Sequence, residues 1–537
     1  MDLIRKIVRV IRFNPRNPGS FLVLAAILLF PTIFWPFDYD QGTFAYGGAA
    51  ILHGQRPYLD FWDIKPPNIF YTYAAAFALF GNSVRAIRVF DYLNAVLTIA
   101  LLFVLATRIW KNGPWRNLAA VMASLAFIVQ YYIFGHWDTA QTETYSLPFL
   151  LGAFLLILPN NSRNHPRVPL RFTLGYLPRA FFAGIFVGIS FYFKFPNALF
   201  LGLIAAAIWL YSGNERRLKS IAWLCAGFLM AVGLESSYLA LNGELLPLWH
   251  ITTSETASYV STNYSGSFGF VSNLRAASQA LDLSWMVMGM LGWVIWIIAR
   301  HDRDKDAVLV FQSFMLLILG SAIALFAVQL QNKGYKYHYA ILLPWADLLI
   351  GAGIALIANM LSHLFKLPRW SMATVLALAL FALNYWVTSS DPLQGRVKEL
   401  ISIANGTEPA NGYIATDSIS DYVIRHTQPS DKIFIFGFQP YVYWKTGRQP
   451  ATKFLNTIHF KPTTVPDAER EELVTSLLRN PPELFLVEMG DRYTSQGNTN
   501  DDSRTTIRMR YPELERLLDQ SYCLKDTIQH TIIYRKR

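Results

Sequence analysis

The chain has 537 residues, of which 53% are hydrophobic and only 15% are charged, and its mean hydropathy is +0.27. Soluble domains contain about 25% charged residues, so this composition excludes a purely water-soluble protein. The formal charge of +11 does not indicate nucleic-acid binding, because Lys and Arg in a membrane protein set topology and contact anionic lipid. Two cysteines, Cys225 and Cys523, are too few for a disulfide scaffold or a cysteine-based zinc site.

Long apolar runs predict an α-helical protein that crosses a membrane many times. A spanning helix needs about 20 largely apolar residues, because its backbone polar groups must be bonded internally. The sequence predicts about eleven such helices, at residues 19–36, 87–109, 117–135, 142–159, 180–194, 197–212, 219–240, 284–300, 307–329, 340–361 and 371–388.

Basic residues gather before the first run and in every second connection after it, which predicts the orientation of the chain. Connections rich in Lys and Arg stay in the cytoplasm. We therefore expect a cytoplasmic N-terminus, two long outer connections at 37–86 and 242–283, and an outer C-terminal region. The predicted location is the inner (plasma) membrane of a bacterium. The basic clusters are Arg5 to Arg16; Arg108, Lys111 and Arg116; Arg163 to Arg179; Arg216, Arg217 and Lys219; Arg300, Arg303 and Lys305; Lys366 and Arg369.

The region after residue 390 contains no run long enough to span a membrane. Its pattern predicts strands at 432–438, 483–488 and 527–534 and helices at 466–478 and 512–518. We therefore expect two domains, a transmembrane domain at 1–389 and a small α/β domain at 390–537 outside the cytoplasm.

The connection at 37–86 concentrates charged residues at the mouth of the membrane domain. Asp38, Asp40, Asp60, Asp63 and Lys65 lie within it. The apolar segments 42–52 and 67–79 flank these charges and are too short or too interrupted to be confident spans, so we expect helices lying at the membrane interface. An ordinary polar loop is the alternative interpretation.

The same connection resembles the first external loop of GT-C membrane glycosyltransferases, in particular the protein O-mannosyltransferase and lipid A aminoarabinose transferase group. The resemblance covers about residues 19–390 and rests on Asp38-Tyr39-Asp40-Gln41-Gly42, the 54–58 segment, Asp60-Phe61-Trp62-Asp63-Ile64-Lys65-Pro66-Pro67, Leu79-Phe80-Gly81 with Arg88, Gln141-Thr142-Glu143, the 184–194 segment, and His338-Tyr339 with Leu343-Pro344. The C-terminal region is similar to small α/β extensions of some bacterial members.

This resemblance implies that a sugar moves, with inversion at its anomeric carbon, from a polyprenyl-phosphate donor to a glycan, lipid or protein acceptor on the outer side. Asp40 is the expected base, and the alternative is that Asp40 caps the helix that includes Gly42. Many family members have Asp-Glu where this chain has Asp40-Gln41. Because Gln cannot act as a base, a two-carboxylate role is not expected there, while Gln41 keeps the ability to bond a sugar hydroxyl.

Basic residues near the outer interface are expected to bind the donor phosphate. Lys65 leads, because related transferases use a basic residue before a proline in this loop, and Lys194 ends the fifth predicted span at the expected outer side. Arg88, Lys336 and His338 are further candidates. The alternatives are a snorkelling interface lysine for Lys65 and an ordinary hydrogen-bonded interface residue for His338.

Other polar residues of the outer connections are expected to position the acceptor or the sugar: Gln41, Asp60, Asp63, Asp138 and Glu143. Asp40, Asp60, Asp138 and Glu143 form an oxygen-rich set that suits Mg²⁺ or Mn²⁺. No fixed ligand spacing requires a metal, and no other cofactor is expected. Glu235, inside the seventh predicted span, fits a helix-pairing role equally well.

Two other classes of protein remain open at this point. A transporter or lipid-linked-sugar flippase also needs many spans and intramembrane charges, but it favours paired broken helices and internal repeats, which the sequence lacks. A scaffold protein that binds through its outer domain leaves the carboxylate-rich loop unexplained.

Overall fold

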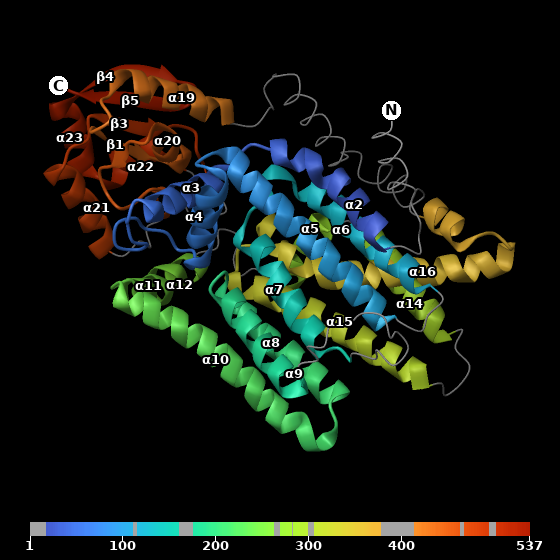
Figure 1. Cartoon of the computed structure of the whole chain (residues 1–537). Helices are drawn as coiled ribbons and strands as arrows, with labels where there is room; N and C mark the ends of the chain where they lie inside the picture. The colour runs from blue at the N-terminus through green and yellow to red at the C-terminus, as the bar shows by residue number, and fades with distance from the viewer. Residues whose placement is uncertain are drawn as a thin grey trace.

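A bundle of apolar helices makes up most of the molecule, and a small sheet lies at one end of it (Figure 1). The computed structural model describes residues 18–110, 115–159, 175–261, 269–281, 283–298, 305–376, 413–461, 467–492 and 501–537. The bundle and the sheet are both built from these residues.

The bundle helices coincide with the predicted spans as far as residue 361. The last predicted span, 371–388, is helical over 371–376 and otherwise lies outside the described residues. The helices are α2 (Pro18–Leu29) with η1 (Phe30–Phe34), α5 (Val84–Ile109), α6 (Arg116–Asp138), α7 (Thr142–Ile157), α8 (Tyr176–Phe191), η2 (Phe195–Leu199) with α9 (Phe200–Tyr211), η3 (Asn214–Arg216) with α10 (Arg217–Leu241), α14 (Leu283–Ile298), α15 (Lys305–Gln331) and α16 (Leu343–Phe365).

Helix length does not confirm the predicted count of eleven spans. Within the described residues, five helices are long and apolar enough to cross a bilayer, or six if the bent pair formed by Ser20–Phe34 and Tyr39–Leu52 is one span. The helices α7, α8 and α9 have 16, 16 and 12 residues, shorter than the usual 17 to 25. The number of spans therefore stays a prediction.

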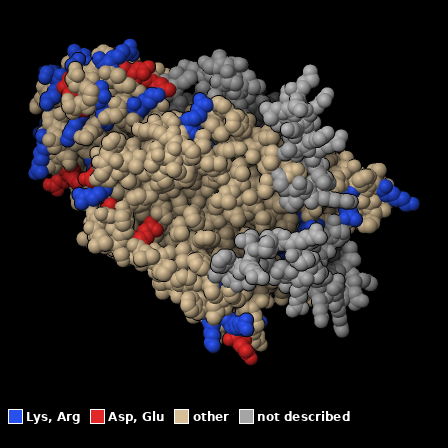
Figure 2. Space-filling view, viewed as in Figure 1, with Lys and Arg blue, Asp and Glu red and all other residues tan. Residues whose placement is uncertain are grey.

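The surface of the bundle suits lipid. Figure 2 shows charged side chains gathered over the C-terminal sheet and at the far ends of the bundle, with a broad uncharged band between them. Large apolar side chains are exposed on the bundle helices, among them Leu93, Leu97, Leu229, Leu234 and Phe326. An apolar surface of this extent is stable in hydrocarbon and costly in water. The chain is an integral membrane protein.

The two predicted interface helices are present as α3 (Tyr39–Leu52) and α4 (Asn68–Phe80). The chain bends by 87° between residues 20–34 and α3. If the first segment crosses the bilayer, α3 runs almost parallel to the membrane surface. Further short elements between the long helices are α11 (Leu245–His250), the π-helix η4 (Ile251–Glu255), α12 (Thr256–Ser261), α13 (Phe270–Ala280) and η5 (Lys336–Leu342).

The C-terminal unit is an α/β fold around a five-stranded sheet of order β2-β1-β3-β5-β4. Strands β1 to β3 are parallel, whereas β4 and β5 form an antiparallel hairpin beside β3. Its elements are α19 (Tyr413–His426), β1 (Lys432–Phe436), α20 (Pro440–Thr446), β2 (Gln449–Pro450), η6 (Ile458–Phe460), α21 (Asp467–Arg479), β3 (Leu484–Glu488), α22 (Ser503–Arg510), α23 (Pro512–Ser521), β4 (Tyr522–Ile528) and β5 (Thr531–Lys536).

Several elements of this unit differ from the sequence prediction. The single strand predicted at 527–534 is wrong, because the chain turns there between β4 and β5, with Gln529 in a left-handed conformation (φ 52°). Gln-His is not a typical turn pair, so the local sequence gives no turn signal. The helices α19, α20 and α22 and the short strand β2 were also not predicted.

The C-terminal unit shares its hydrophobic core with the connection at 37–86. Side chains of α3 and α4, such as Phe44 and Phe70, belong to the same buried cluster as Ile433 and Tyr443. A Cβ on Gly42 would lie only 2.8 Å from the backbone nitrogen of Tyr441, so glycine lets α20 approach α3. Whether the domain boundary falls at 389/390 lies outside the described residues.

Glycine also allows close packing of α8 against α10. A Cβ on Gly227 would lie 1.9 Å from the carbonyl oxygen of Phe181, whereas a Cβ on Gly233, in the same helix, would meet nothing within 4 Å. Small residues at such positions let helix backbones approach closely in membranes.

We therefore predict that Gly227→Ala destabilises the bundle by about 1 to 3 kcal/mol, the usual cost of overpacking. Gly233→Ala is the matched control and should leave stability unchanged or slightly higher, because Ala favours helix. Thermal unfolding of both variants in detergent measures the difference. Equal melting temperatures would contradict the close packing of α8 and α10.

Candidate functional site

A cavity of about 290 Å³ lies where the bundle meets the C-terminal unit. Its charged side chains and one of its imidazoles come from the first loop, the α8–η2 connection and η5: Asp40, Asp63, Lys65, Lys194 and His338. Its aromatic wall includes Tyr39, Trp137, Tyr259, Tyr335 and Tyr337, and the C-terminal unit adds Phe438, Asn456 and His459. Residues from separate parts of the chain thus form one concave site of the kind that binds small molecules.

Asp40 occupies the first turn of α3, and Asp38 is the residue that caps this helix. The Asp38 carboxylate accepts a hydrogen bond from the backbone N–H of Tyr39, and the Gln41 side chain accepts one from the backbone N–H of Asp38 at 2.7 Å. This reciprocal arrangement is a capping box, in which Gln serves as well as Glu. The alternative interpretation of Asp40 as the N-cap is therefore wrong, and the Asp40 side chain faces the cavity instead.

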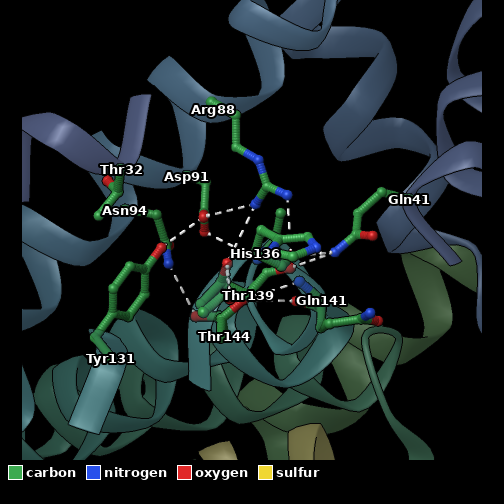
Figure 3. Close-up of polar contacts among 12 residues, drawn as sticks. Thr32, Gln41, Arg88, Asp91, Asn94, Tyr131, His136, Thr139, Gln141 and Thr144 are labelled. Atoms are coloured by element: carbon green, nitrogen blue, oxygen red, sulfur yellow. Dashed lines mark hydrogen bonds and ion pairs between the residues drawn. The ribbon is translucent and has the colours of Figure 1, made fainter. Parts of the chain in front are cut away.

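Gln41 is fully buried and holds α3 against the α6–α7 connection. Its amide nitrogen donates to the carbonyl oxygens of His136 at 2.9 Å, Trp137 at 3.0 Å and Thr139 at 2.8 Å (Figure 3). Both ends of the amide are thus used within the protein, and Gln41 does not line the cavity. This position does not support the predicted contact with a sugar hydroxyl.

Arg88 lies at the centre of the same buried network and also does not line the cavity (Figure 3). Its guanidinium donates to Thr139 Oγ1 at 3.2 Å, to the His136 carbonyl at 3.0 Å and to the Pro36 carbonyl. It pairs with Asp91 at 3.7 Å, and Asp91 accepts a hydrogen bond from Tyr131. This geometry supports a structural role for Arg88 and not the predicted contact with donor phosphate.

Each of the two cavity lysines is paired with a carboxylate. Lys65 Nζ lies 3.9 Å from Asp40 Oδ2, and Lys194 Nζ lies 2.7 Å from Glu143 Oε1. Lys65 Nζ also bonds the Tyr337 hydroxyl at 3.1 Å. Since Lys65 is 9% exposed and turned toward these groups, it is not a snorkelling surface lysine.

The loop around Lys65 is fixed by local hydrogen bonds. Asp63 Oδ1 accepts from the Lys65 backbone N–H at 2.8 Å, and the Tyr58 hydroxyl donates to the Lys65 carbonyl at 2.8 Å. The backbone N–H of Trp62 bonds the carbonyl of Lys453 at 2.9 Å, which ties the loop to the C-terminal unit. Burial raises the pKa of Asp63 to about 6, against the lowering effect of nearby Lys65.

The remaining predicted residues lie apart from the cavity. Asp60 is exposed and pairs with Arg56 at 3.6 Å. Asp138 pairs with Lys336 at 3.7 Å, and Lys336 also bonds the carbonyl of Ile133. The structure therefore does not assemble Asp40, Asp60, Asp138 and Glu143 as a metal site. Among the described residues, the group of side chains suited to a metal ion is His250, Glu255 and Glu469.

The aromatic and C-terminal walls of the cavity were not predicted from sequence. Tyr39 stacks on Phe438 with ring centroids 5.1 Å apart, and the hydroxyl groups of Tyr259 and Tyr335 are 3.2 Å apart. Burial, followed by the charges of Lys65 and Lys333, lowers the pKa of His459 to about 3, so this imidazole is neutral at pH 7. One sequence signal for the aromatic wall was available, the tyrosine-rich string Tyr335-Lys336-Tyr337-His338-Tyr339. No local pattern marks Phe438 or His459 as cavity residues.

The whole architecture is similar to that of two solved membrane glycosyltransferases. ArnT from Cupriavidus metallidurans, solved bound to undecaprenyl phosphate, matches with a TM-score of 0.59 and 13% identity over 96% of this chain and 97% of that one. The oligosaccharyltransferase AglB from Archaeoglobus fulgidus, solved with an inhibitory peptide and a dolichol-phosphate, matches with a TM-score of 0.51 and 11% identity over 87% of this chain and 69% of that one.

The chain thus has the fold of the GT-C membrane glycosyltransferases. Within it, residues 64–238 match the family model described as dolichyl-phosphate-mannose-protein mannosyltransferase. These findings confirm the resemblance inferred from the first loop. Comparison of the sequence with curated proteins gives no match.

The buried network predicts the effect of changing Arg88. Arg88→Met leaves Asp91 as a buried charge without its cation, which costs about 3 kcal/mol or more in stability. Arg85→Met, at an exposed position three residues earlier in α5, is the matched control and should be nearly neutral. Thermal unfolding in detergent tests both variants. If the Arg88→Met protein is stable and only its donor binding is weakened, the result would instead favour a role of Arg88 in binding the donor phosphate.

Proposed function

We propose that this protein is an inverting glycosyltransferase that moves a sugar from a polyprenyl-phosphate donor to an acceptor on the extracytoplasmic side of the membrane. The observation that carries this proposal is the cavity at the end of the bundle, where Asp40 faces two lysines from different elements, Lys65 and Lys194. The similarity to ArnT and AglB, and the mannosyltransferase-type domain at 64–238, supports the same class of reaction.

Lys65 and Lys194 are suited to hold the donor phosphate. Both are buried at the end of the bundle, where a charge interacts strongly with an opposite charge because little water screens it. As the bond between the anomeric carbon and the phosphate oxygen breaks, negative charge builds up on that phosphate. Ammonium groups already in place stabilise this charge without reorganisation.

Asp40 is suited to act as the base in the same step. The acceptor hydroxyl gives its proton to the Asp40 carboxylate while its oxygen bonds the anomeric carbon from the face opposite the leaving phosphate. One bond to carbon forms as another breaks, so the configuration inverts. Glu143 pairs with Lys194 and in this proposal sets the position of that ammonium group. Asp63 and His338 line the cavity and remain candidates for substrate positioning.

The distribution of basic residues supports the proposed orientation. Arg216 and Arg217 lie at the start of α10, at the end of the bundle far from the C-terminal unit (Figure 1). If this end is cytoplasmic, the cavity faces outward. A C-terminal fusion to alkaline phosphatase should be active, and a fluorescent protein that folds only in the cytoplasm should stay dark. The reverse result would overturn the orientation.

A transporter is not favoured. The cavity and its lysines lie at the end of the bundle, against the C-terminal unit, whereas transporter sites lie near the middle of the membrane. Membranes containing the protein should transfer radiolabelled sugar from polyprenyl-phosphate donors to an endogenous acceptor. Movement of the intact lipid-linked sugar across the bilayer without transfer would contradict the proposal.

The catalytic role of Asp40 predicts a large loss of rate in Asp40→Asn. This variant keeps the size of the side chain and leaves the Asp38 cap intact, but it cannot accept a proton. Turnover should fall by roughly a hundredfold or more, with donor binding and folding retained. Asp60→Asn, in the exposed part of the same loop, is the control and should turn over normally. Near-normal turnover of Asp40→Asn at saturating substrates would eliminate Asp40 as the base.

The phosphate-binding role of the lysines predicts weaker donor binding in Lys65→Met and Lys194→Met. Loss of a hydrogen bond to a charged group costs about 1.5 to 3 kcal/mol, which corresponds to about a tenfold to hundredfold rise in Kd. Lys445→Met is the control, because Lys445 lies on α20 outside the cavity and is 43% exposed. Donor titration in detergent measures these values. Unchanged affinity in both cavity variants would place the phosphate elsewhere.

A further inference from the structure

A cluster of metal-ligating side chains joins an outer segment of the membrane domain to the C-terminal unit, apart from the lysines of the cavity. His250 ends α11, Glu255 ends the π-helix η4, and Glu469 lies in the first turn of α21. One ligand atom of each residue lies within 4.8 Å of the other two, and His250 Nδ1 is 3.7 Å from Glu255 Oε1.

The π-helix is what places His250 and Glu255 on the same side. In an α-helix, residues five positions apart differ by about 140° in direction, because each residue turns the chain by about 100°. A π-helix is wider and closes hydrogen bonds between residues five apart. The five residues Ile251–Glu255 form such a turn, so the His250 imidazole and the Glu255 carboxylate are directed to the same place. π-turns of this kind are often found at functional sites.

Glu469 provides a second, independent indication of a ligand. Its side chain is 7% exposed, and its Oε2 atom is buried without a hydrogen-bond partner. The neighbouring cations are directed elsewhere, since Arg470 pairs with Asp467 at 3.9 Å and Lys453 with Glu472 at 2.7 Å. A buried carboxylate oxygen without a partner is costly. Ligand oxygens of Glu255 and Glu469 lie within 4.8 Å of each other, so two carboxylates face one another at this point.

We propose that His250, Glu255 and Glu469 bind one Zn²⁺ ion. An imidazole nitrogen and two carboxylate oxygens suit Zn²⁺, which is held by nitrogen and oxygen ligands in tetrahedral sites with water in a fourth position. Mg²⁺ and Ca²⁺ prefer all-oxygen sites, so a histidine ligand disfavours them. The exposed side of His250 leaves a path by which the ion enters.

The bound ion would fix one wall of the cavity. Three residues that line the cavity lie within five positions after Glu255 in the chain: Thr256, Tyr259 and Val260. Glu469 belongs to the C-terminal unit, so the metal would tie α11 and η4 to α21 and hold the start of that wall in place. This role is structural. It does not depend on the proposed glycosyltransferase activity, and it involves none of the lysines or Asp40.

Zinc binding by the full-length protein in detergent tests the proposal without any activity measurement. After removal of metals with a chelator, ZnCl₂ is titrated against the protein in competition with a fluorescent zinc indicator. We expect one Zn²⁺ per chain. Loss of a residue that only hydrogen-bonds a metal ligand weakens metal affinity by about 10-fold to 100-fold. Loss of a ligand itself should cost more, so the zinc affinity of His250→Ala and of Glu469→Gln should each fall by more than about tenfold.

Two controls separate this site from general histidine or carboxylate binding. His53→Ala removes an exposed histidine at the end of α3, and Glu472→Gln removes a carboxylate from the same helix of the C-terminal unit as Glu469; both should bind zinc as the unmodified chain does. Absence of zinc binding, unchanged affinity in His250→Ala, or equal binding of MgCl₂ or CaCl₂ would each overturn the proposal.

Thermal unfolding gives a second measurement that keeps the test decisive if Glu469→Gln folds poorly. Binding to the folded state alone raises the melting temperature. ZnCl₂ should raise the melting temperature of the unmodified chain and of His53→Ala, and it should leave that of His250→Ala unchanged. His250 is exposed, so its removal is compatible with folding. A zinc-induced shift of the same size in His250→Ala would contradict the site.

Discussion

Buried positive charge at the end of the helix bundle is the constraint on which the arrangement of the site depends. An ammonium group removed from water needs an opposite charge or a set of hydrogen bonds close by. Lys65 has Asp40 and the Tyr337 hydroxyl, and Lys194 has Glu143. These partners come from α3, η5 and α7, so the two lysines join elements that are distant in sequence.

The rigidity of this site comes from a layer of contacts behind it. Arg88 and Gln41 bind the backbone carbonyls of the α6–α7 connection, and they hold the start of α3 in place. Asp40 follows the capping residue Asp38 by two positions, so its direction depends on that layer. The polar residues of the motifs that resemble the glycosyltransferase family therefore form two groups. One group faces the cavity, and the other fixes the backbone that carries the first group.

The C-terminal unit is part of the site and not an appendage. It packs on α3 at Gly42, joins the Lys65 loop through the Trp62–Lys453 hydrogen bond, and contributes Phe438, Asn456 and His459 to the cavity. The proposed zinc site adds a third link, through Glu469. Under the proposed activity, an acceptor in the cavity would contact residues of both parts of the chain.

Composition and local pattern alone established the membrane class and the positions of most bundle helices. They also located both interface helices and the loop that carries Asp40 and Lys65. These features depend on apolar periodicity and on short motifs. Local pattern did not reveal the direction of individual side chains. Asp38, two residues before Asp40, became the cap, Gln41 and Arg88 turned inward, and the tyrosines of the aromatic wall joined the site. Those outcomes depend on contacts between distant residues, such as Lys65 with Tyr337, which are 272 positions apart. Only the packed tertiary structure brings such partners together, since no helix or strand period connects them.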